Sequence, residues 1–384
     1  MLALPIATGV AGFIPSLVGL IVVFAFMLYS LMLLLEANLL APEGSNIISM
    51  ARQELGVWGE ITAWLMYLLL LYAAIAAYIA GGGSLIHGVL QSLHLTSVNW
   101  ISEIIFLVFF GTFVYFGTRS VDYINRFLTI GLIFAYLLLV TFVTPHAELD
   151  KLESGDAKFI WAALPIIALS FTSHLILPSI RAYYKSNVKH LLIVLLVGSL
   201  IPLIMYVAWE VTVLGIIPIE GKDGLQAIHN SAHSVSDLAA SLSHYTQVSW
   251  LGSIAGFFSF FALVTSFLGA SLSLLHFLRD GFKMEDNANN RVWLILLTYI
   301  PPFLFALFYP RGFVMALSYG GVFIAVLYGI LPVLMVWKAR YVEKRAMSFR
   351  VPGGKPALVI MFIAAIFIVV IQILATVHVL PALQ

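Results

Sequence analysis

The chain has 384 residues, of which 62% are hydrophobic and 10% are charged, and its mean hydropathy is +1.04. A soluble protein of this size carries far more charge, so most of this surface must face a lipid bilayer. The net charge of +1 gives no reason to expect a nucleic acid partner, and the absence of cysteine excludes disulfides, thiol catalysis and cysteine metal sites.

Ten apolar segments predict membrane-spanning helices, each of which needs about 20 residues. None of the ten contains Lys or Arg. In chain order they are Phe13–Leu40, Val57–Gly83, Val98–Gly117, Leu128–Phe142, Ile160–Ile180, Leu191–Val213, Trp250–Leu278, Val292–Tyr309, Phe313–Trp337 and Ala357–Leu380. The fourth is short, and we expect it to begin earlier, near Tyr123. The segment before Phe13 is too short to cross. We therefore expect a single transmembrane domain over residues 1–384.

The loops between these spans differ in their content of Lys and Arg. One set of loops contains 15 of the 19 basic residues, and the other contains only Lys151, Lys158, Lys222 and Arg311. Basic residues concentrate in cytoplasmic loops, so the first set is predicted to face the cytoplasm. The segment before Phe13 and the C-terminus are then both predicted to lie outside.

Three loops have features of their own. Residues Ser45 to Leu55 have apolar side chains at helical spacing, which predicts a short interfacial helix with Ser45 as its N-cap. The polar external loop Gly221–Val248 contains a helix-like stretch near Ser234–Leu242. Residues Lys338 to Lys355 form a basic cytoplasmic linker before the last span.

The fifth span, which with Phe159 reads FIWAALPIIALSFTSHLILPSI, is interrupted at its middle. A polar cluster, residues 170–174, lies there between Pro165 and Pro178. Proline removes a helical hydrogen bond, and a membrane helix tolerates this only where protein, water or ligand meets the freed backbone groups. Broken helices at mid-membrane form the substrate sites of secondary transporters. The alternative is a kink that packs against neighbouring helices.

The residues around Pro178 have a counterpart at the start of the chain. Leu177-Pro178-Ser179-Ile180 matches Leu4-Pro5-Ile6-Ala7, and this alignment places His174 opposite Met1. The two segments are five spans apart and run in opposite directions, as in an inverted repeat. We therefore expect an all-α polytopic membrane protein with two five-helix repeats, residues 1–143 and 159–337. The linker 338–355 and an eleventh helix, residues 356–384, would follow.

Several longer motifs carry a resemblance to a known family. They are MLALPIATGVAGF, LLLEANLL, YAAIAAYIAGGG, SVDYINRFL and FALFYPRGFVMALSYGGV. The chain resembles the bacterial hydroxy/aromatic amino acid permeases of the amino acid/polyamine/organocation superfamily, and most closely the tyrosine- and tryptophan-specific members. The resemblance implies the leucine-transporter fold and import of tyrosine or tryptophan with a proton across the bacterial inner membrane. It implies no cofactor besides the coupling proton and no obligate protein partner.

The chain departs from that family in three places. Relatives begin with a half-helix and a Gly-rich break before the residue that matches Met1, so we expect a first helix truncated at its N-terminal half. A start codon assigned too late is the explanation we favour. Some relatives carry a Lys in the fifth helix, and residues 129–133 contain none. A polar neutral residue is common where Glu210 stands. The identity of the proton carrier is therefore left open.

Candidate substrate-binding residues come from the break, its N-terminal counterpart and two other spans. Hydroxyl groups in the break can hydrogen-bond an amino acid, and the family pattern YAAIAAY places Tyr72 beside the substrate, where its ring would stack. Tyr78 is expected nearer the outer gate. Core packing is the alternative for both tyrosines, and close helix packing is the alternative for Thr265 and Ser266. The candidates are Met1, Leu2, Tyr72, Ser170, Phe171, Thr172, Ser173, His174, Thr265 and Ser266.

Three residues are candidates for carrying the proton. His174 titrates near neutral pH, although a neutral histidine bonded to a backbone carbonyl is equally compatible with the sequence. Glu36 and Glu210 are carboxylates inside spans, where acids are costly and often functional. Both lie near enough to an interface for hydration to be the alternative reading. His229 and His233 in the external loop lack further zinc ligands, so no metal site is predicted.

Two other functions remain open at this stage. A membrane-embedded enzyme would need paired carboxylates or a metal-ligand cluster, and the spans contain neither an H-E-x-x-H motif nor an Asp-rich pair. A non-transporting sensor or an inactive truncated permease is the other alternative, because of the expected gap in the first helix.

Overall fold

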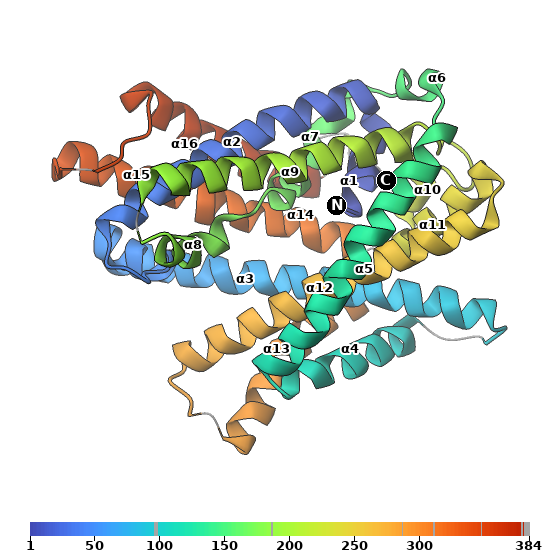
Figure 1. The fold of residues 1–384 in the computed structure, drawn as a ribbon, viewed down its shortest axis with the longest axis horizontal. Coiled ribbons are helices and arrows are strands. Elements are labelled where there is room, and N and C mark those ends of the chain that lie inside the picture. Colours follow the sequence, from blue (N-terminus) through green and yellow to red (C-terminus); the bar gives the residue numbers. More distant parts are fainter. Residues whose placement is uncertain are drawn as a thin grey trace.

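The computed structural model describes residues 1–95, 99–185, 187–285, 287–309, 312–346, 348–377 and 379. All regular structure in these ranges is helical (Figure 1). Within them, nine helices are long and apolar enough to cross a membrane, and Trp100–Tyr115 is a shorter apolar helix. The chain is therefore a multi-pass membrane protein. Predictions that concern Val98, Arg311 and residues 380–384, including the outside position of the C-terminus, lie outside the described residues.

The bounds of the helices follow the predicted spans closely. The helices are α1 (Ala3–Thr8), α2 (Phe13–Leu40), α3 (Ile47–Ser92), α4 (Asn99–Tyr115), α5 (Thr118–Val143), α6 (Leu149–Leu152), α7 (Ile160–Ser170), α8 (Leu177–Tyr183), α9 (Val188–Leu214), α10 (Leu225–Asn230), α11 (Ser234–Thr246), α12 (Ser249–Gly281), α13 (Ala288–Phe308), α14 (Gly312–Ile324), α15 (Leu331–Trp337) and α16 (Gly354–Thr376). A π-helical turn, Ala325–Ile330, joins α14 to α15, and another, Lys338–Val342, follows α15.

Helix α5 begins well before the predicted start near Tyr123. Gly117, at φ +91°, precedes the first turn, and the helix runs from Thr118. Its first two turns are charged, and Arg126 pairs with Asp122 at 2.9 Å with i,i+4 spacing. Such a pair supports a helix but lowers its hydropathy, which is why an apolar window missed these turns.

The short helix that was predicted for residues 45–55 is present as the first part of α3, and its place at the membrane interface stays a prediction. Gly56 has φ +74° and ψ −156°, so it separates residues 47–55 from the membrane span that follows. The predicted N-cap, Ser45, is wrong. Asn46 is the cap, and its side-chain oxygen accepts hydrogen bonds from the backbone N–H groups of Ile48 and Ser49, each at 3.0 Å. An Asn side chain in this position satisfies donors that the first turn leaves free.

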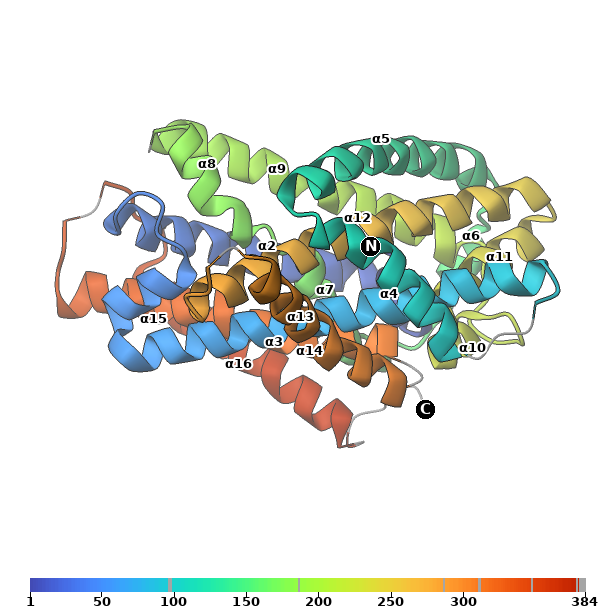
Figure 2. The same cartoon turned by 90° about the horizontal axis from the view of Figure 1, so that it is seen from below.

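The short helix α1 is buried inside the bundle. Figures 1 and 2 both show the N-terminus in the middle of the molecule, and all six residues of α1 are buried. The helix packs on α7, α9, α10 and α14. It is followed by Gly12 at φ +87°, where a Cβ would lie 2.1 Å from the Ser154 carbonyl oxygen. Only glycine fits that approach, so α1 turns sharply into α2 there.

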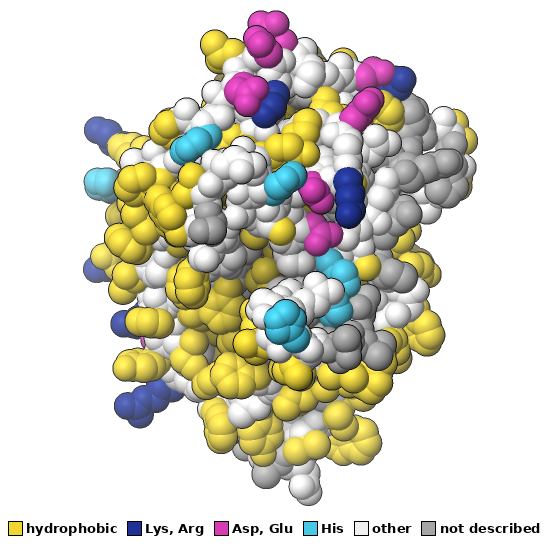
Figure 3. Space-filling model, turned by 90° about the vertical axis from the view of Figure 1, so that its right-hand side faces the viewer, with side chains coloured by type: hydrophobic (Ala, Val, Ile, Leu, Met, Phe, Trp, Pro, Cys, Tyr) yellow, Lys and Arg dark blue, Asp and Glu magenta, His cyan; other side chains and the backbone are white. Residues whose placement is uncertain are grey.

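The two ends of the bundle differ in their contacts. At one end, which we call the basic end, Arg181 donates to the carbonyl oxygens of Asn38 and Ala41, and Lys338 donates to that of Glu54. At the opposite end lie α6, α10 and α11 (Figure 1). Figure 3 views this opposite end, where acidic and histidine side chains gather among hydrophobic ones. The connection before α7 meets the turn after α1 there, through a 3.1 Å hydrogen bond from Asp156 N–H to Val10.

Candidate functional site

The predicted break is present between α7 and α8. Residues Phe171 to Ser173 are not helical, and a 3-10 turn, His174–Ile176, leads into α8. The hydroxyl groups of Ser170 and Thr172 donate to the carbonyl oxygens of Ile166, at 2.9 Å, and of Leu169, at 2.8 Å. Such side-chain bonds compete with the helical ladder. Pro178, in the first turn of α8, then restarts the helix.

The carbonyl group that the break frees is bound by a neighbouring helix. The Tyr206 hydroxyl of α9 donates to the Ser170 carbonyl oxygen at 2.8 Å. The ring centroid of Phe171 lies 5.2 Å from that of Tyr206 and 5.5 Å from that of Phe24. The break is thus held from one side by aromatic side chains of α2 and α9.

A cavity of about 450 Å³ adjoins the break. Residues from α1, α3, α5, α7, α9, α12 and α14 line it, together with Thr172 of the break. The volume lies within the range of about 300–1,000 Å³ that small-molecule sites occupy. Six of the ten predicted substrate-binding residues line this one cavity, and they are Met1, Leu2, Ser170, Thr172, Thr265 and Ser266.

The lining combines apolar surface with a few hydroxyl groups. Its apolar part includes Leu132, Phe258 and Phe313. The Thr265 hydroxyl donates to the Phe261 carbonyl oxygen at 2.8 Å, as the Ser170 and Thr172 hydroxyls do within their own segment. A hydroxyl oxygen whose proton is donated in this way can still accept hydrogen bonds from other groups. The cavity can therefore accept the donors of an ammonium group and pack an apolar ring.

The other four predicted residues lie outside this cavity. Phe171 and Ser173 line a smaller adjoining cavity of about 160 Å³. His174 lines a different cavity of about 610 Å³ at the basic end. Tyr72 lines none of the three, because its hydroxyl donates to the Leu297 carbonyl oxygen of α13 at 2.9 Å.

Tyr78, rather than Tyr72, is the tyrosine of α3 that lines this cavity. The two residues are six positions apart on α3, and at about 100° per residue they face different directions. Tyr78 lines the 450 Å³ cavity and hydrogen-bonds with Ser266. Tyr72 therefore lies outside this cavity, and its place beside the substrate, which came from the family pattern, stays a prediction.

Replacing Tyr78 is expected to weaken substrate binding more than replacing Tyr72. Tyr78→Ala removes a ring from the cavity, and an aromatic contact contributes about 0.5–1.5 kcal/mol beyond its buried area, or roughly two- to tenfold in affinity. Tyr72→Ala is the matched control, because it removes the same side chain from the same helix on another face. Uptake kinetics in proteoliposomes with labelled tyrosine, a substrate that the family resemblance implies, would measure both. A larger rise in KM for Tyr72→Ala than for Tyr78→Ala would show that Tyr72, not Tyr78, makes the aromatic contact with the substrate.

His174 is packed in the protein rather than open to the hydroxyl-lined cavity. Its side chain is 1% exposed, and its ring stacks on that of Tyr328 with centroids 4.5 Å apart. Its Nε2 lies 3.2 Å from the Ser30 hydroxyl, which donates its own proton to the Tyr328 carbonyl oxygen. Ser30 must therefore accept, so Nε2 carries the proton of a neutral ring. This arrangement ties the start of α8 to α2 and to the π-helical turn.

We expect His174→Ala to reduce uptake more than it reduces the amount of protein in the membrane. The imidazole positions the segment that follows the break, so its loss disturbs the site without exposing a large core. Ser30→Ala is the companion variant, because it keeps the ring and removes its partner. Uptake normalised to membrane expression is the measurement, and a wild-type value for His174→Ala would show that the packing alone is dispensable.

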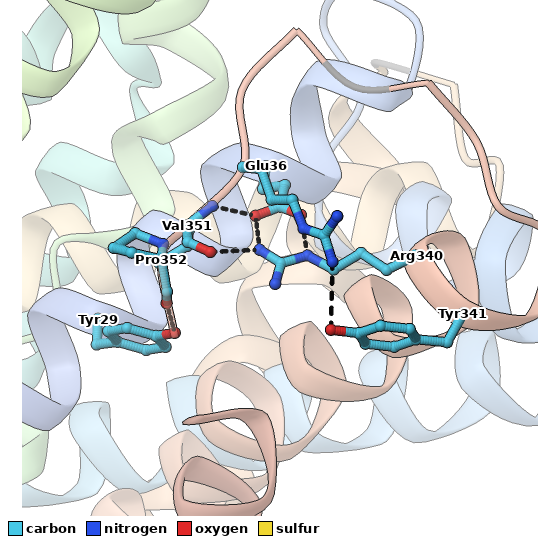
Figure 4. A network of polar contacts seen from close by, with 7 residues as sticks. Tyr29, Glu36, Arg340, Tyr341, Val351 and Pro352 are labelled. Carbon is cyan, nitrogen blue, oxygen red and sulfur yellow. Dashed lines mark hydrogen bonds and ion pairs between the residues drawn. The ribbon is translucent and has the colours of Figure 1, made fainter. Parts of the chain in front are cut away.

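Glu36 is part of a buried ion pair. Arg340 donates from Nε and Nη2 to the two carboxylate oxygens, and the Val351 backbone N–H donates at 2.7 Å (Figure 4). Both charged side chains are fully buried, so the expectation that Glu36 is hydrated is wrong. The sequence placed Glu36 close to an interface, but the linker folds over it. A carboxylate held in this bidentate geometry is suited to a structural role.

Glu210 is also buried, at 0% exposure, and the expectation of hydration is wrong here too. It lies on α9 where that helix meets α1, and the Thr8 hydroxyl is 3.0 Å from each carboxylate oxygen. In the described ranges no Lys, Arg, His or N-terminal amine pairs with it within 4.0 Å.

The two histidines of the loop that was predicted to be external make contacts with α1 and α3. His229 Nδ1 lies 3.1 Å from the Ile6 carbonyl oxygen, and the His233 ring stacks on that of His87 with centroids 4.2 Å apart. Burial lowers the pKa of His233, and the neighbouring His87 lowers it further. Across the described ranges no group of three or more His, Asp or Glu side chains is placed to hold a metal ion.

Two residues of the cavity were not singled out in the sequence. Tyr206 caps the break, and Phe258 contributes to the apolar wall. Tyr206 could have been noticed, because it is a polar side chain inside an apolar span and lies four residues after Pro202. Phe258 is one of 28 phenylalanines, and nothing local distinguishes it.

An interrupted membrane helix beside a ligand-sized cavity, within a bundle of membrane-spanning helices, defines a transport protein. Comparison with known sequences agrees with this class. The chain belongs to the tryptophan/tyrosine permease family, whose sequence profile matches residues 1–372. Its relatives are transport proteins, and the family is one of permeases rather than enzymes.

Three relatives illustrate the similarity. The chain is 36% identical to tyrosine-specific transport system 1 of Haemophilus influenzae, over 96% of this chain and 91% of the relative. It is 34% identical to tyrosine-specific transport system 2 of the same organism, over 97% and 92%. It is 33% identical to the tryptophan-specific transport protein of Pseudomonas aeruginosa, over 99% and 92%.

Proposed function

We propose that this protein imports an aromatic amino acid, tyrosine or tryptophan, across the bacterial inner membrane by proton symport. The observation that carries the proposal is the 450 Å³ cavity at the break, which joins hydroxyl groups to aromatic and aliphatic walls. The names of the relatives support the substrate class, because they are tyrosine- and tryptophan-specific transport proteins. The basic end would face the cytoplasm and the C-terminus the periplasm.

The proposed architecture is the five-plus-five inverted repeat with an eleventh helix. Its two halves are residues 1–143 and 159–337, and α1 in the first half would correspond to the segment after the break in the second. Supporting this pairing, Met1 and Leu2 line the same cavity as Ser170 and Thr172. Two interrupted segments that meet at one site are what such a repeat would provide.

The two ends of the molecule differ in how they are covered, and this difference supports a direction of substrate release. At the end opposite the basic end, α10 covers α1, with the Leu225 side chain directly over Gly9 and His229 beside Ile6. At the basic end lies the larger cavity of about 610 Å³, which includes Arg52 and Glu60. We infer that this arrangement is closed to the periplasm and that substrate would leave toward the cytoplasm.

Reconstitution into proteoliposomes tests the proposal. Labelled tyrosine and tryptophan should accumulate when the outside is more acidic than the inside, and accumulation should collapse when a protonophore removes the gradient. Protein-free liposomes and an Ala262→Phe variant, whose added ring would occupy the cavity, are the controls. Uptake that does not depend on the pH gradient would contradict the proposed proton symport.

The alternative is a sensor or an inactive permease that binds the substrate without moving it. Its signature would be saturable binding of labelled tyrosine to detergent-solubilised protein, together with no uptake in any gradient. Because binding and uptake are measured on the same preparation, the two functions give different results. The tight packing of α10 on α1 is the observation that keeps this alternative open.

A further inference from the structure

We propose that Glu210 carries the coupling proton and that Thr8 transmits its protonation state to α1. This inference rests on the proposed function, because it names the residues through which proton and substrate binding would be linked. It concerns two side chains on different helices, Thr8 at the last residue of α1 and Glu210 near the end of α9.

The Thr8 hydroxyl has one proton to donate, but several acceptor oxygens lie within hydrogen-bond distance of it. Its oxygen lies 2.8 Å from the Leu4 carbonyl oxygen and 3.0 Å from each oxygen of the Glu210 carboxyl group. A hydroxyl donates once, so it cannot serve the carbonyl and an ionised carboxylate together. When Glu210 is protonated, its O–H donates to Thr8 and Thr8 donates to Leu4. With a proton on Glu210, the contacts of Thr8 with Leu4 and with the carboxyl group can therefore both be hydrogen bonds.

Burial makes the free-energy difference between ionised and protonated Glu210 large. Thr8 and Glu210 are each 0% exposed. An ionised carboxylate in such a place needs a paired cation or several donors, and the hydrogen bonds of the described residues offer Glu210 at most one hydroxyl, that of Thr8. Among the ion pairs of the described residues, the α-amino group of Met1 makes none with Glu210 within 4.0 Å. The closed arrangement of α1 on α9 therefore favours the protonated acid.

Other titratable groups on elements that pack against α9 are engaged elsewhere. Tyr136 of α5 donates to the Met205 carbonyl oxygen at 3.0 Å, and Lys151 of α6 bonds to Glu148 and to the Ile216 carbonyl oxygen. His146, in the turn after α5, bonds to the Phe142 carbonyl oxygen and is exposed. On α2, Glu36 is held by Arg340. His229 of α10 lies with its Nδ1 3.1 Å from the Ile6 carbonyl oxygen of α1.

Helix α1 connects this acid to the cavity. Met1, Leu2 and Ala3, at its start, line the cavity, whereas Thr8 at its end holds Glu210. Loss of the proton leaves a buried charge, which is relieved when α1 and α9 separate enough to admit water. That separation moves the residues that line the cavity. Proton and substrate therefore favour the same closed arrangement, and each raises the affinity of the other.

Glu210→Gln tests the assignment, because the amide has nearly the same shape as a protonated acid and cannot ionise. In wild-type protein we expect substrate affinity to fall as the pH rises, and substrate uptake to carry protons inward. In Glu210→Gln we expect substrate affinity that no longer depends on pH and exchange of labelled for unlabelled substrate that persists. Accumulation in a pH gradient should be lost, so that the inside concentration does not exceed the outside concentration.

Variants at Thr8 test the transmission separately. Thr8→Val keeps the shape and removes the hydroxyl, and we expect it to flatten the pH dependence of substrate affinity. Thr8→Ser restores the hydroxyl and should restore the wild-type pH profile. If Glu210→Gln does not reach the membrane, the comparison of the valine and serine variants still decides the question.

Gradient-driven accumulation by Glu210→Gln at the wild-type level would overturn the proposal, and so would a wild-type pH profile in Thr8→Val. These failures differ from failure of the proposed function. If wild-type protein showed no proton-driven uptake of any aromatic amino acid, the proposed function itself would fall, and this inference with it.

Discussion

A disulfide between positions 88 and 236 is expected to stop uptake completely, and a reducing agent is expected to restore it. Position 88 is near the C-terminal end of α3, and position 236 is in the first turn of α11. A Cβ at Gly88 would lie 3.4 Å from the Cβ of Ser236, close to the range of about 3.5–4.5 Å in disulfides. The Ser84 and Ser236 hydroxyls, 3.0 Å apart, show that the two helices touch.

The physical reason lies in the cover that α10 and α11 form at the end opposite the basic end. For substrate to reach the cavity from that side, the cover must move away from α1 and α3. A covalent bond between α3 and α11 prevents this movement, whereas the hydrogen bonds that now join them contribute only about 0.5–1.5 kcal/mol each. The disulfide therefore prevents the movement of α10 and α11 and leaves the residues that line the cavity unchanged.

The chain contains no cysteine, so the double variant Gly88→Cys/Ser236→Cys has no competing thiols. Its uptake would be compared before and after oxidation, with the bond verified by mass spectrometry. Each single cysteine variant is a matched control and should transport under both conditions. Full uptake by a completely cross-linked sample would show that α11 stays in place during transport.

Arg340→Met is expected to give the largest loss of stability. It leaves the Glu36 carboxylate buried without its cation, and breaking a buried ion pair from one side costs about 3–5 kcal/mol. The pair also holds the linker, because Arg340 donates to the Val351 carbonyl oxygen at 2.9 Å and the Tyr29 hydroxyl bonds to that of Pro352 (Figure 4). The melting temperature of the purified protein in detergent should fall sharply.

The double variant Glu36→Gln/Arg340→Met is the control, since it removes both charges. Replacing both members of a buried pair is often close to neutral, so the double variant should recover much of the stability that the single variant loses. Equal melting temperatures for the single and double variants would show that the unpaired charge is not the cause. An unchanged melting temperature in Arg340→Met would show that the pair contributes little.

Much of the fold was predictable from local patterns. Phe13–Leu40 was predicted with the bounds that α2 has, because an uninterrupted apolar run of that length has no stable alternative to a membrane helix. The break after Ser170 was predictable too. Pro178 and the hydroxyl-bearing cluster act on the backbone within one or two turns, so their effect can be inferred without knowing what packs nearby.

The direction in which each side chain points depended on the tertiary structure. Tyr72 and Tyr78 lie on one predicted helix, and only the positions of α12 and α13 decide that Tyr78 meets Ser266 while Tyr72 meets Leu297. His174 belongs to the polar cluster in sequence, yet it packs on Tyr328, 154 positions away. An apolar run predicts a helix in lipid but not which face turns inward, because lipid is as apolar as the neighbouring helices.

The roles of the two intramembrane acids were decided in the same way. The sequence alone established a polytopic membrane protein with a broken helix and two acids in its spans, because apolar length and proline position act locally. It could not distinguish Glu36, which pairs with Arg340 from 304 positions away, from Glu210, whose hydrogen-bond partner among the described residues is the Thr8 hydroxyl. The partner of a buried charge is set by how distant helices pack. Only the tertiary structure therefore decided that Glu36 is neutralised by a cation, and it supports the proposal that Glu210 holds the proton.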